Sequence, residues 1–369
     1  GERPNPTLGV SPGYTFNAEG GKSPWFPGFS ADLPIETAGK RGLRISRAER
    51  LALAARHHVT AVAWQLRRAL RAALIDLTAS RHRLALLQAQ AATQRRMVEL
   101  LQARQAAGAA SKTELSMARI AMTKLQVDAA DAERQRTEAL SRLAEALGVP
   151  FAALQDERFS FDLKANPSAP DAMQARRLAL RRRSDIRAAL VDYDVSEAEL
   201  EAEIAKQYPN IHVGTGYQWD QGENKWSLGI SAELPVFNRN RGGIAEAEAR
   251  RREVAARFRA LQAKITAEID HAIAAHALAV EQLGRARAWQ RAQEAQLGRM
   301  EARFAAGDID QLEFQTAKLD SDAAALTVLA REVYVAQTAG ALEDALQLPF
   351  PALSLAEGPS VALTPKDRP

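Results

Sequence analysis

Proline is absent from two long stretches of the chain, and no other sequence feature constrains the fold as strongly. All 16 prolines among the 369 residues lie outside Ile35–Val149 and Val236–Leu348. A proline inside a helix costs about 3 kcal/mol, so proline-free stretches rich in Ala, Leu, Arg, Glu and Gln are typical of helix. A glycine-containing turn interrupts each stretch near its middle, at residues 108–111 and 307–310. We therefore predict two long helical hairpins, over residues 39–149 and 239–348.

The first arm of each hairpin has roughly 65 residues, which is about 100 Å at 1.5 Å per residue. Apolar residues recur along the arms at a spacing of seven, which is typical of a coiled-coil seam. These residues are Leu70, Leu77, Leu84, Ala91 and Val98 in the first hairpin and Leu312, Leu319, Leu326 and Val333 in the second. Many seam positions hold Ala, which buries little area, so we expect each helix to need more than one neighbour.

The two hairpins are copies of each other. Residues 103–108 match residues 302–307 at five of six positions, and residues 29–34 match 230–235 at four of six. The period of this internal repeat is about 200 residues. The second copy opens with a predicted helix over residues 171–207 that the first copy lacks. We therefore expect roughly 40 further helical residues before residue 1 of this chain, with a signal sequence upstream of them.

Between the helices, two segments alternate apolar residues with small or polar ones. They cover residues 1–38 and 208–238, with glycine-containing turns at 19–22 and 221–224. The alternation predicts two β-hairpins with strands of about ten residues, the length of a membrane-spanning strand. Four strands cannot close a barrel, and an open edge is not tolerated in a bilayer. The chain must therefore oligomerise if these strands span a membrane; the alternative is a small soluble sheet packed on helices.

Composition excludes several classes of function. The 49 basic and 45 acidic residues are interspersed, whereas a nucleic-acid-binding protein concentrates basic residues on one face. The lack of Cys excludes disulfides, thiol catalysis and thiolate metal sites. The six histidines have no metal-ligand spacing with a carboxylate, so we expect them to be solvated or packed. With no phosphate loop, nucleophile motif or long apolar stretch, we expect no enzymatic activity, cofactor, bound metal or transmembrane helix.

A β-hairpin followed by a long helical hairpin, repeated twice, resembles the TolC-like outer-membrane factors, the exit ducts of tripartite efflux and secretion systems. The resemblance covers roughly residues 3–350. Its local motifs are Arg3-Pro4-Asn5-Pro6, Arg183-Ser184-Asp185-Ile186 and Tyr208-Pro209. Within the family, residues 33–41 and 234–240 are most similar to the heavy-metal-efflux branch.

This resemblance implies a mainly α-helical chain with a small β part. It implies a homotrimer in the outer membrane, in which each chain contributes four strands to one twelve-stranded barrel and its helices form a periplasmic tunnel. The expected segments are 1–38 (first β-hairpin), 39–149 (first helical hairpin), 150–170 (equatorial linker), 171–207 (helix), 208–238 (second β-hairpin), 239–348 (second helical hairpin) and 349–369 (equatorial tail).

The expected function is a passive duct for efflux, with heavy-metal cations as the substrate. The expected partners are lipid of the outer membrane, a periplasmic adaptor (membrane fusion) protein and an inner-membrane RND-type transporter; no nucleic acid is expected. A drug-efflux or type I secretion duct is the alternative within the family. A soluble coiled-coil scaffold and a metal-dependent helical-bundle enzyme are alternatives from other classes; amphipathic strands argue against the scaffold, and the lack of Glu-x-x-His pairs argues against the enzyme.

The resemblance also points to individual residues. Acidic residues beyond the second hairpin turn narrow the periplasmic mouth in the family; the matching position is Glu313, mirrored by Glu114, while Thr316 departs from the second acidic position. The alternative for both acids is helix capping. Asp32 and Glu233 are expected at equivalent strand positions in the barrel lumen. The candidates for adaptor docking are Gly108, Ser111, Lys112, Gly307 and Asp308.

Overall fold

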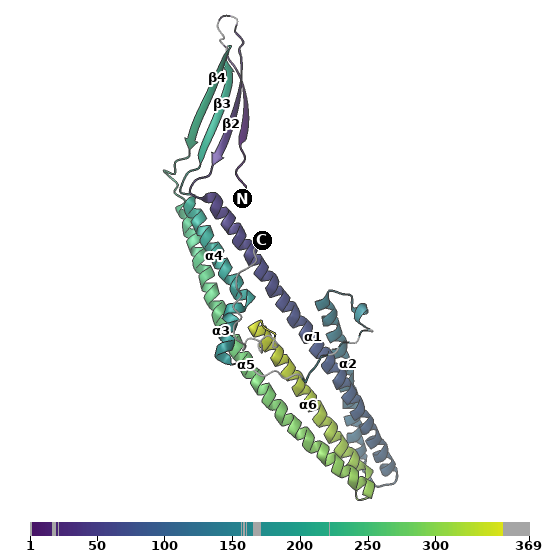
Figure 1. Cartoon of the computed structure of the whole chain (residues 1–369). Coiled ribbons are helices and arrows are strands. Elements are labelled where there is room, and N and C mark those ends of the chain that lie inside the picture. The colour runs from purple at the N-terminus through teal and green to yellow at the C-terminus, as the bar shows by residue number, and fades with distance from the viewer. Residues whose placement is uncertain are drawn as a thin grey trace, which may run out of the picture. The chain divides into compact units, whose positions relative to one another are not determined.

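The computed structural model describes residues 2–16, 20, 22–155, 157, 159, 161–164, 171–220 and 222–349. The chain is mainly helical with four strands, as predicted (Figure 1). The elements are β1 Thr7–Tyr14, β2 Trp25–Ile35, α1 Lys40–Ala106, α2 Lys112–Leu147, the 3₁₀ helix η1 Phe151–Leu154, α3 Ala172–Arg182, α4 Ser184–Ala205, β3 Ile211–Asp220, β4 Glu223–Ala232, α5 Arg241–Ala306 and α6 Gln311–Leu346. They form two compact units, one of residues 1–59 and 184–262 and one of residues 60–183 and 263–369.

The first unit contains a four-stranded antiparallel sheet in the order β1-β2-β3-β4. β2 and β3 join the two repeats, with Phe29 opposite Tyr217 and Ile35 opposite Ile211. Directly opposed residues share a face, so this register places most of the apolar residues of all four strands on one face; Phe26, opposite Gly13, lies on the other. The apolar face includes Leu8, Val10, Phe29, Leu33, Val213, Tyr217, Trp226, Leu228 and Ile230. Most of these side chains are exposed; Leu228, for example, is 73% exposed.

The fourth strand is shorter than the alternation predicts. β4 ends at Ala232, although the alternation continues to Val236, because Ala232 already opposes Ile211, the first residue of β3. Pro209, two residues before the start of β3, has no N–H with which to extend the β3–β4 ladder. At the other end Asp220 pairs with Glu223, so Glu223 and Asn224, which the sequence placed in the turn, belong to β4.

Side-chain hydrogen bonds tie the sheet to the helices of its unit, where α4 ends and α1 and α5 begin (Figure 1). Lys40 Nζ donates to the carbonyl oxygen of Tyr208 over 2.6 Å and to Asn210 Oδ1 over 2.7 Å. Asn240 Nδ2 donates to Glu203 Oε2 over 2.7 Å. The hydrogen bond from Lys206, followed by that from Asn240, lowers the pKa of Glu203. The Lys40 bonds hold the segment before β3 against the start of α1, and the Asn240 bond holds the end of α4 against the start of α5.

The second unit contains the distal parts of both helical hairpins. α1 packs on α2 through Ala73 and Leu77 near one end and Leu101 near the turn. On another face α1 packs on α6, through a cluster that includes Ile75 and Leu329. α5 meets α6 in a cluster formed by Ala279, Leu283, Ala286, Val328 and Val335. The need for more than one neighbour per helix is therefore met for α1 within a single chain.

The helix predicted over 171–207 is formed by two helices, α3 and α4, because the helix is interrupted at Arg183. The backbone there is extended, with φ −58° and ψ 130°. The buried Arg183 guanidinium donates to the carbonyl oxygen of Ala345 over 2.6 Å and lies 3.7 Å from Glu268. Because both partners of Arg183 are far away in the sequence, no local sequence pattern predicts the interruption between α3 and α4.

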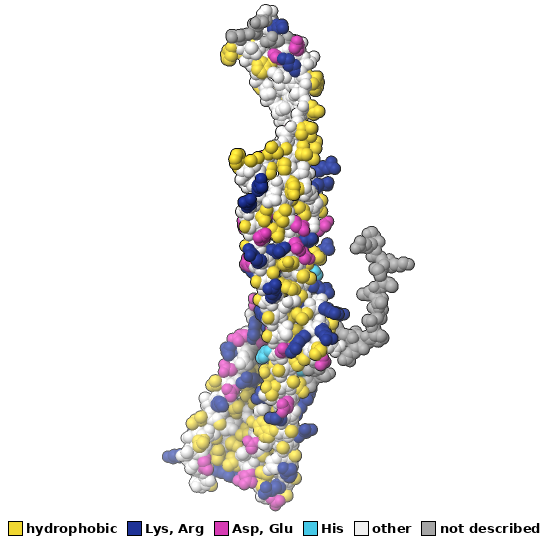
Figure 2. All heavy atoms as spheres, turned by 90° about the vertical axis from the view of Figure 1, so that its left-hand side faces the viewer, with side chains coloured by type: hydrophobic (Ala, Val, Ile, Leu, Met, Phe, Trp, Pro, Cys, Tyr) yellow, Lys and Arg dark blue, Asp and Glu magenta, His cyan; other side chains and the backbone are white. Residues whose placement is uncertain are grey.

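The predicted equatorial segments are partly described. η1 and residues 161–164 belong to the linker, and Leu163 packs against Ile75 and Leu329. Residues 165–170 and 350–369 lie outside the described residues. The division into seven segments stays a prediction. None of the helices described is long and apolar enough to cross a membrane. On the face shown in Figure 2, basic and acidic side chains are mixed along the helices.

Candidate functional site

The turn of the first helical hairpin is built by a glycine and a capping serine. Gly108 has φ 76°, and the Ala109 N–H donates to the carbonyl oxygen of Arg104 over 2.8 Å, which closes a Schellman motif. α2 then begins after Ser111, which forms a capping box with Glu114. The Ser111 N–H donates to Glu114 Oε2 over 2.7 Å, and the Glu114 N–H donates to Ser111 Oγ over 3.1 Å.

The second hairpin turns in the same way but is capped differently. Gly307 has φ 83°, and the Asp308 N–H donates to the carbonyl oxygen of Arg303 over 2.9 Å. Asp310 is the N-cap of α6, since its Oδ1 accepts from the N–H groups of Leu312 and Glu313 over 2.8 and 2.9 Å. Its other oxygen accepts from Arg104 Nη2 over 2.7 Å. Asp310 therefore caps α6 and joins the two hairpin turns at once.

This geometry separates the two acidic residues predicted at the mouth. The Ser111 backbone N–H, followed by its hydroxyl, holds the pKa of Glu114 below its usual value, as the capping alternative requires. Because Asp310 takes the capping role in the second copy, the exposed Glu313 carboxylate has no hydrogen-bond partner among the described residues. Thr316 Oγ1 donates to the carbonyl oxygen of Leu312 over 2.9 Å and is satisfied within its own helix.

The five docking candidates also divide. Gly108, Ser111 and Gly307 have a local structural task in closing the turns or capping α2. Lys112 and Asp308 are exposed, and within the described residues their side chains form no hydrogen bond. The structure therefore leaves these two side chains available for a partner.

The polar face of the sheet carries the predicted lumen residue Asp32 and a histidine that the sequence did not single out. Asp32 Oδ2 lies 2.8 Å from His212 Nδ1 on the neighbouring strand. Small residues surround this pair: Gly214 opposes both Asp32 and Gly229, and Ser231 opposes His212. The face is polar and glycine-lined where the opposite face is apolar.

Glu233 does not occupy a strand position equivalent to that of Asp32. It follows the last residue of β4, whereas Asp32 lies inside β2 between two paired strands. The reason is the early end of the β3–β4 ladder at Ile211 and Ala232. Asp32 and Glu233 are therefore equivalent in the sequence repeat, but only Asp32 lies within a paired strand.

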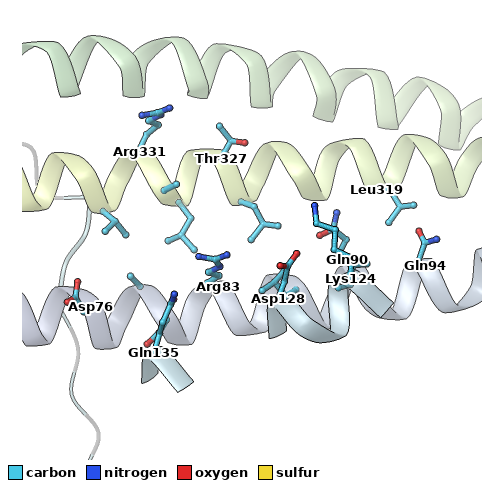
Figure 3. Close-up of a pocket in the computed structure, with 18 of the residues that line it drawn as sticks. Asp76, Arg83, Gln90, Gln94, Lys124, Asp128, Gln135, Leu319, Thr327 and Arg331 are labelled. Carbon is cyan, nitrogen blue, oxygen red and sulfur yellow. The ribbon is translucent and has the colours of Figure 1, made fainter. Parts of the chain in front are cut away.

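A groove of 990 Å³ runs between α1, α2 and α6 in the second unit (Figure 3). Its labelled polar side chains come from all three helices: Asp76, Arg83, Gln90 and Gln94 from α1, Lys124, Asp128 and Gln135 from α2, and Thr327 and Arg331 from α6. Charged side chains of both signs and amides line it, together with apolar residues such as Leu319 and Leu326. No three His, Cys, Asp or Glu side chains of the described residues come together as metal ligands.

The profile of the family described as "Outer membrane efflux protein" matches residues 4–149 and 175–346, which is most of the chain. The chain belongs to the outer membrane efflux protein family. Proteins of this family are outer-membrane channels that extend into the periplasm, so the chain is an outer-membrane protein. The family consists of channels and is not a family of enzymes. Its channels are trimers that work with an adaptor and an RND-type transporter.

One curated relative is the cobalt-zinc-cadmium resistance protein CzcC of Cupriavidus metallidurans. It is 25% identical over 218 residues, which cover 58% of this chain. The chain spans about half, 51%, of the length of that relative.

Solved structures share the fold of this outer membrane efflux protein. The outer-membrane channel OprN has a TM-score of 0.76 at 18% identity, over 94% of this chain and 81% of that one. CusC, whose structures concern conformational changes that accompany folding and transmembrane channel formation, has a TM-score of 0.72 at 17% identity, over 93% of this chain and 82% of that one. These likenesses confirm the predicted fold class, and the match to the family profile confirms the resemblance drawn from the motifs.

Sequence reasoning missed Arg104, Asp310 and His212 as members of the site. Asp310 could have been found, because an Asp three residues before Glu313 at the start of a helix is an N-terminal signature. Arg104 and His212 have no local signal, since their partners lie 206 and 180 residues away.

Proposed function

We propose that the chain forms the passive exit duct of a tripartite system that exports heavy-metal cations. The observation that carries this proposal is the register of the sheet, which gives four strands one exposed apolar face and one polar face. A water-filled barrel in lipid requires this pair of faces. Three chains that close one twelve-stranded barrel supply the pairs that the outer strands lack within one chain.

The substrate class is supported by the similarity to CzcC, whose name states cobalt, zinc and cadmium resistance. Acidic side chains along the proposed path also favour a cationic substrate, because carboxylates attract cations. Glu313 at the hairpin turn and Asp32 on the polar face are the stronger candidates, while Glu233 lies beyond the strand and Glu114 is held by a cap. Because Thr316 stands at the second acidic position of the family, the mouth of a trimer would carry a single ring of acidic residues, formed by three copies of Glu313.

The partners we propose are two further copies of the chain, outer-membrane lipid, a periplasmic adaptor that docks at Lys112 and Asp308, and an inner-membrane RND-type transporter that supplies the energy. That the chain is not itself an enzyme and binds no nucleic acid stays a prediction.

The test measures conductance of the purified protein in planar bilayers, followed by metal tolerance in a host that lacks its own exit duct but holds a matching adaptor and transporter. We expect discrete cation-preferring conductance and restored tolerance to zinc, cobalt or cadmium. Glu313→Gln should lower the cation preference more than Glu114→Gln, the matched control in the other turn. Absence of any conductance would contradict the duct; conductance with unchanged metal tolerance would contradict the substrate class.

A further inference from the structure

His212 and Asp32 lie on the polar face of the sheet and are both reachable from solvent. Their side chains are 41% and 39% exposed, and Nδ1 of His212 lies 2.8 Å from Oδ2 of Asp32. Exposed His–Asp contacts contribute little to stability. The main effect of the contact is therefore on the orientation and the tautomer of the His212 imidazole.

The contact determines which nitrogen of the imidazole can bind a cation. An ionised carboxylate only accepts hydrogen bonds, so Nδ1–H donates to Asp32, and Nε2 of the neutral ring carries the lone pair. Metal-binding histidines almost always donate their other ring N–H to a carboxylate or carbonyl, which orients the ring and raises its basicity. Among the described residues, Nε2 of His212 has no hydrogen-bond partner.

The polar face around the pair carries only small residues on β4. Ser231 opposes His212, and Gly229, opposite Gly214, is so open that a Cβ there would meet no atom within 4 Å. Lysines close to the pair along the chain or on the same face already have partners: Lys40 donates to Tyr208 and Asn210, Lys206 is paired with Glu203 at 2.6 Å, and Lys225 is paired with Asp220 at 2.8 Å. The net charge of the pair is −1 when the imidazole is neutral, which favours a cation.

We propose that His212, positioned by Asp32, is a weak binding site for divalent transition-metal ions on the channel-facing side of the sheet. Nε2 supplies one nitrogen ligand, water supplies the others, and Zn²⁺ and its neighbours accept imidazole, whereas Mg²⁺ prefers oxygen. Weak binding suits a channel, because an ion must enter the site and also leave it. This inference rests on the proposed function, since it assumes that the polar face lines the cation path, and it replaces the expectation that His212 is only solvated.

The first test is block of the single-channel conductance by Zn²⁺, measured on the full chain in planar bilayers. We expect Zn²⁺ to reduce the potassium current reversibly and Mg²⁺ to have no comparable effect. His212→Gln should abolish the block, and Asp32→Asn should weaken it by about 10- to 100-fold, as for other outer partners of metal ligands. His58→Gln, a change of an exposed histidine on α1, should leave it unchanged.

The outcomes separate this inference from the proposed function. Equal Zn²⁺ block in the wild type and His212→Gln, or equal block by Zn²⁺ and Mg²⁺, would overturn the site and leave the channel intact. Absence of conductance would overturn the channel. If there is no conductance, or if His212→Gln fails to assemble, the site can still be tested in the wild-type protein. There, Zn²⁺ but not Mg²⁺ should slow carbethoxylation of His212 relative to that of His58, as measured by mass spectrometry of peptides. No such protection would overturn the site.

Discussion

Asp310 performs two tasks with one carboxylate, and this sets it apart from every other residue at the hairpin turns. Oδ1 caps α6 through two backbone N–H groups, and Oδ2 accepts from Arg104 on α1. The hydrogen bond from Arg104, followed by the one from the Glu313 N–H, lowers the pKa of Asp310 below its usual 3.8. Protonation would weaken both contacts together.

The resulting prediction concerns pH. Because the folded-state pKa of Asp310 is lowered, its contribution is fully present above pH 3.8 and is lost as the pH falls through the lowered value. Hydrogen exchange of the first turn of α6 should show protection that declines in this range. Asp310→Asn keeps a capping oxygen but does not titrate, so its protection should not show this decline. The same decline in both proteins would contradict the assignment.

The hairpins turn where they do because a glycine at the end of each first arm adopts a left-handed conformation. Gly108 and Gly307 both have positive φ and both close Schellman motifs. The glycines inside α5 have no positive φ, and a Cβ at Gly298 would meet nothing within 4 Å. Glycine therefore stabilises the turn that follows α5 but weakens the interior of that helix.

Gly307→Ala should destabilise the hairpin by about 1–2 kcal/mol, because an L-residue pays for the left-handed conformation. Gly298→Ala should instead stabilise it by about 0.5–1 kcal/mol, since alanine loses less backbone entropy in a helix. The denaturation midpoints of the two variants against wild type measure both effects. Shifts of the same sign would show that the turn does not depend on backbone conformation.

The strands owe their two faces to a period of two, so adjacent residues of β4 should respond in opposite ways to one substitution. Leu228 lies on the apolar face and Ser227 on the polar face. Leu228→Arg should cost up to about 2–4 kcal/mol in a bilayer, while an arginine on the lumen side costs little. Folding into lipid vesicles, followed by gel mobility, should fail or weaken for Leu228→Arg and proceed for Ser227→Arg. Equal folding of the two would contradict a lipid-facing apolar surface.

At the scale of the whole molecule, the sheet is incomplete in one chain. In the part of the chain that the structure describes, β1 and β4 each pair on one side only, and two strands lie between them. With about 4.8 Å between strands, β1 and β4 of one chain are about 14 Å apart in an open sheet, too far for a disulfide. Closure by neighbouring copies would instead place β4 of one chain beside β1 of the next.

This predicts a specific cross-linking pattern in a chain that contains no Cys. Gly9→Cys on β1, combined in turn with Lys225→Cys, Ser227→Cys or Gly229→Cys on the same face of β4, should form bonds between chains. Denaturing gels after mild oxidation should show bands of two and three linked chains for at least one pair. Single-cysteine variants are the control. A ladder that continues beyond three chains, or monomers from every pair, would contradict a closed trimer.

The sequence alone determined the features that depend on neighbours along the chain. Proline-free stretches, glycine turns and periods of seven and two act within a few residues, so they predicted the helical hairpins, their turns and the two faces of the strands. The repeat and the family motifs extended this to the fold class, which the family membership and the solved structures confirm.

Only the tertiary structure decided which polar residues meet. Arg104 reaches Asp310 across 206 residues, Asp32 reaches His212 across 180, and Arg183 interrupts a helix to reach Ala345 across 162. The early end of β4, which separates Glu233 from Asp32, also follows from pairing with β3 and not from its own alternation. Local periodicity selects an element and its buried face, but a hydrogen bond depends on where the packed elements bring two side chains together, and that position is set by the whole fold.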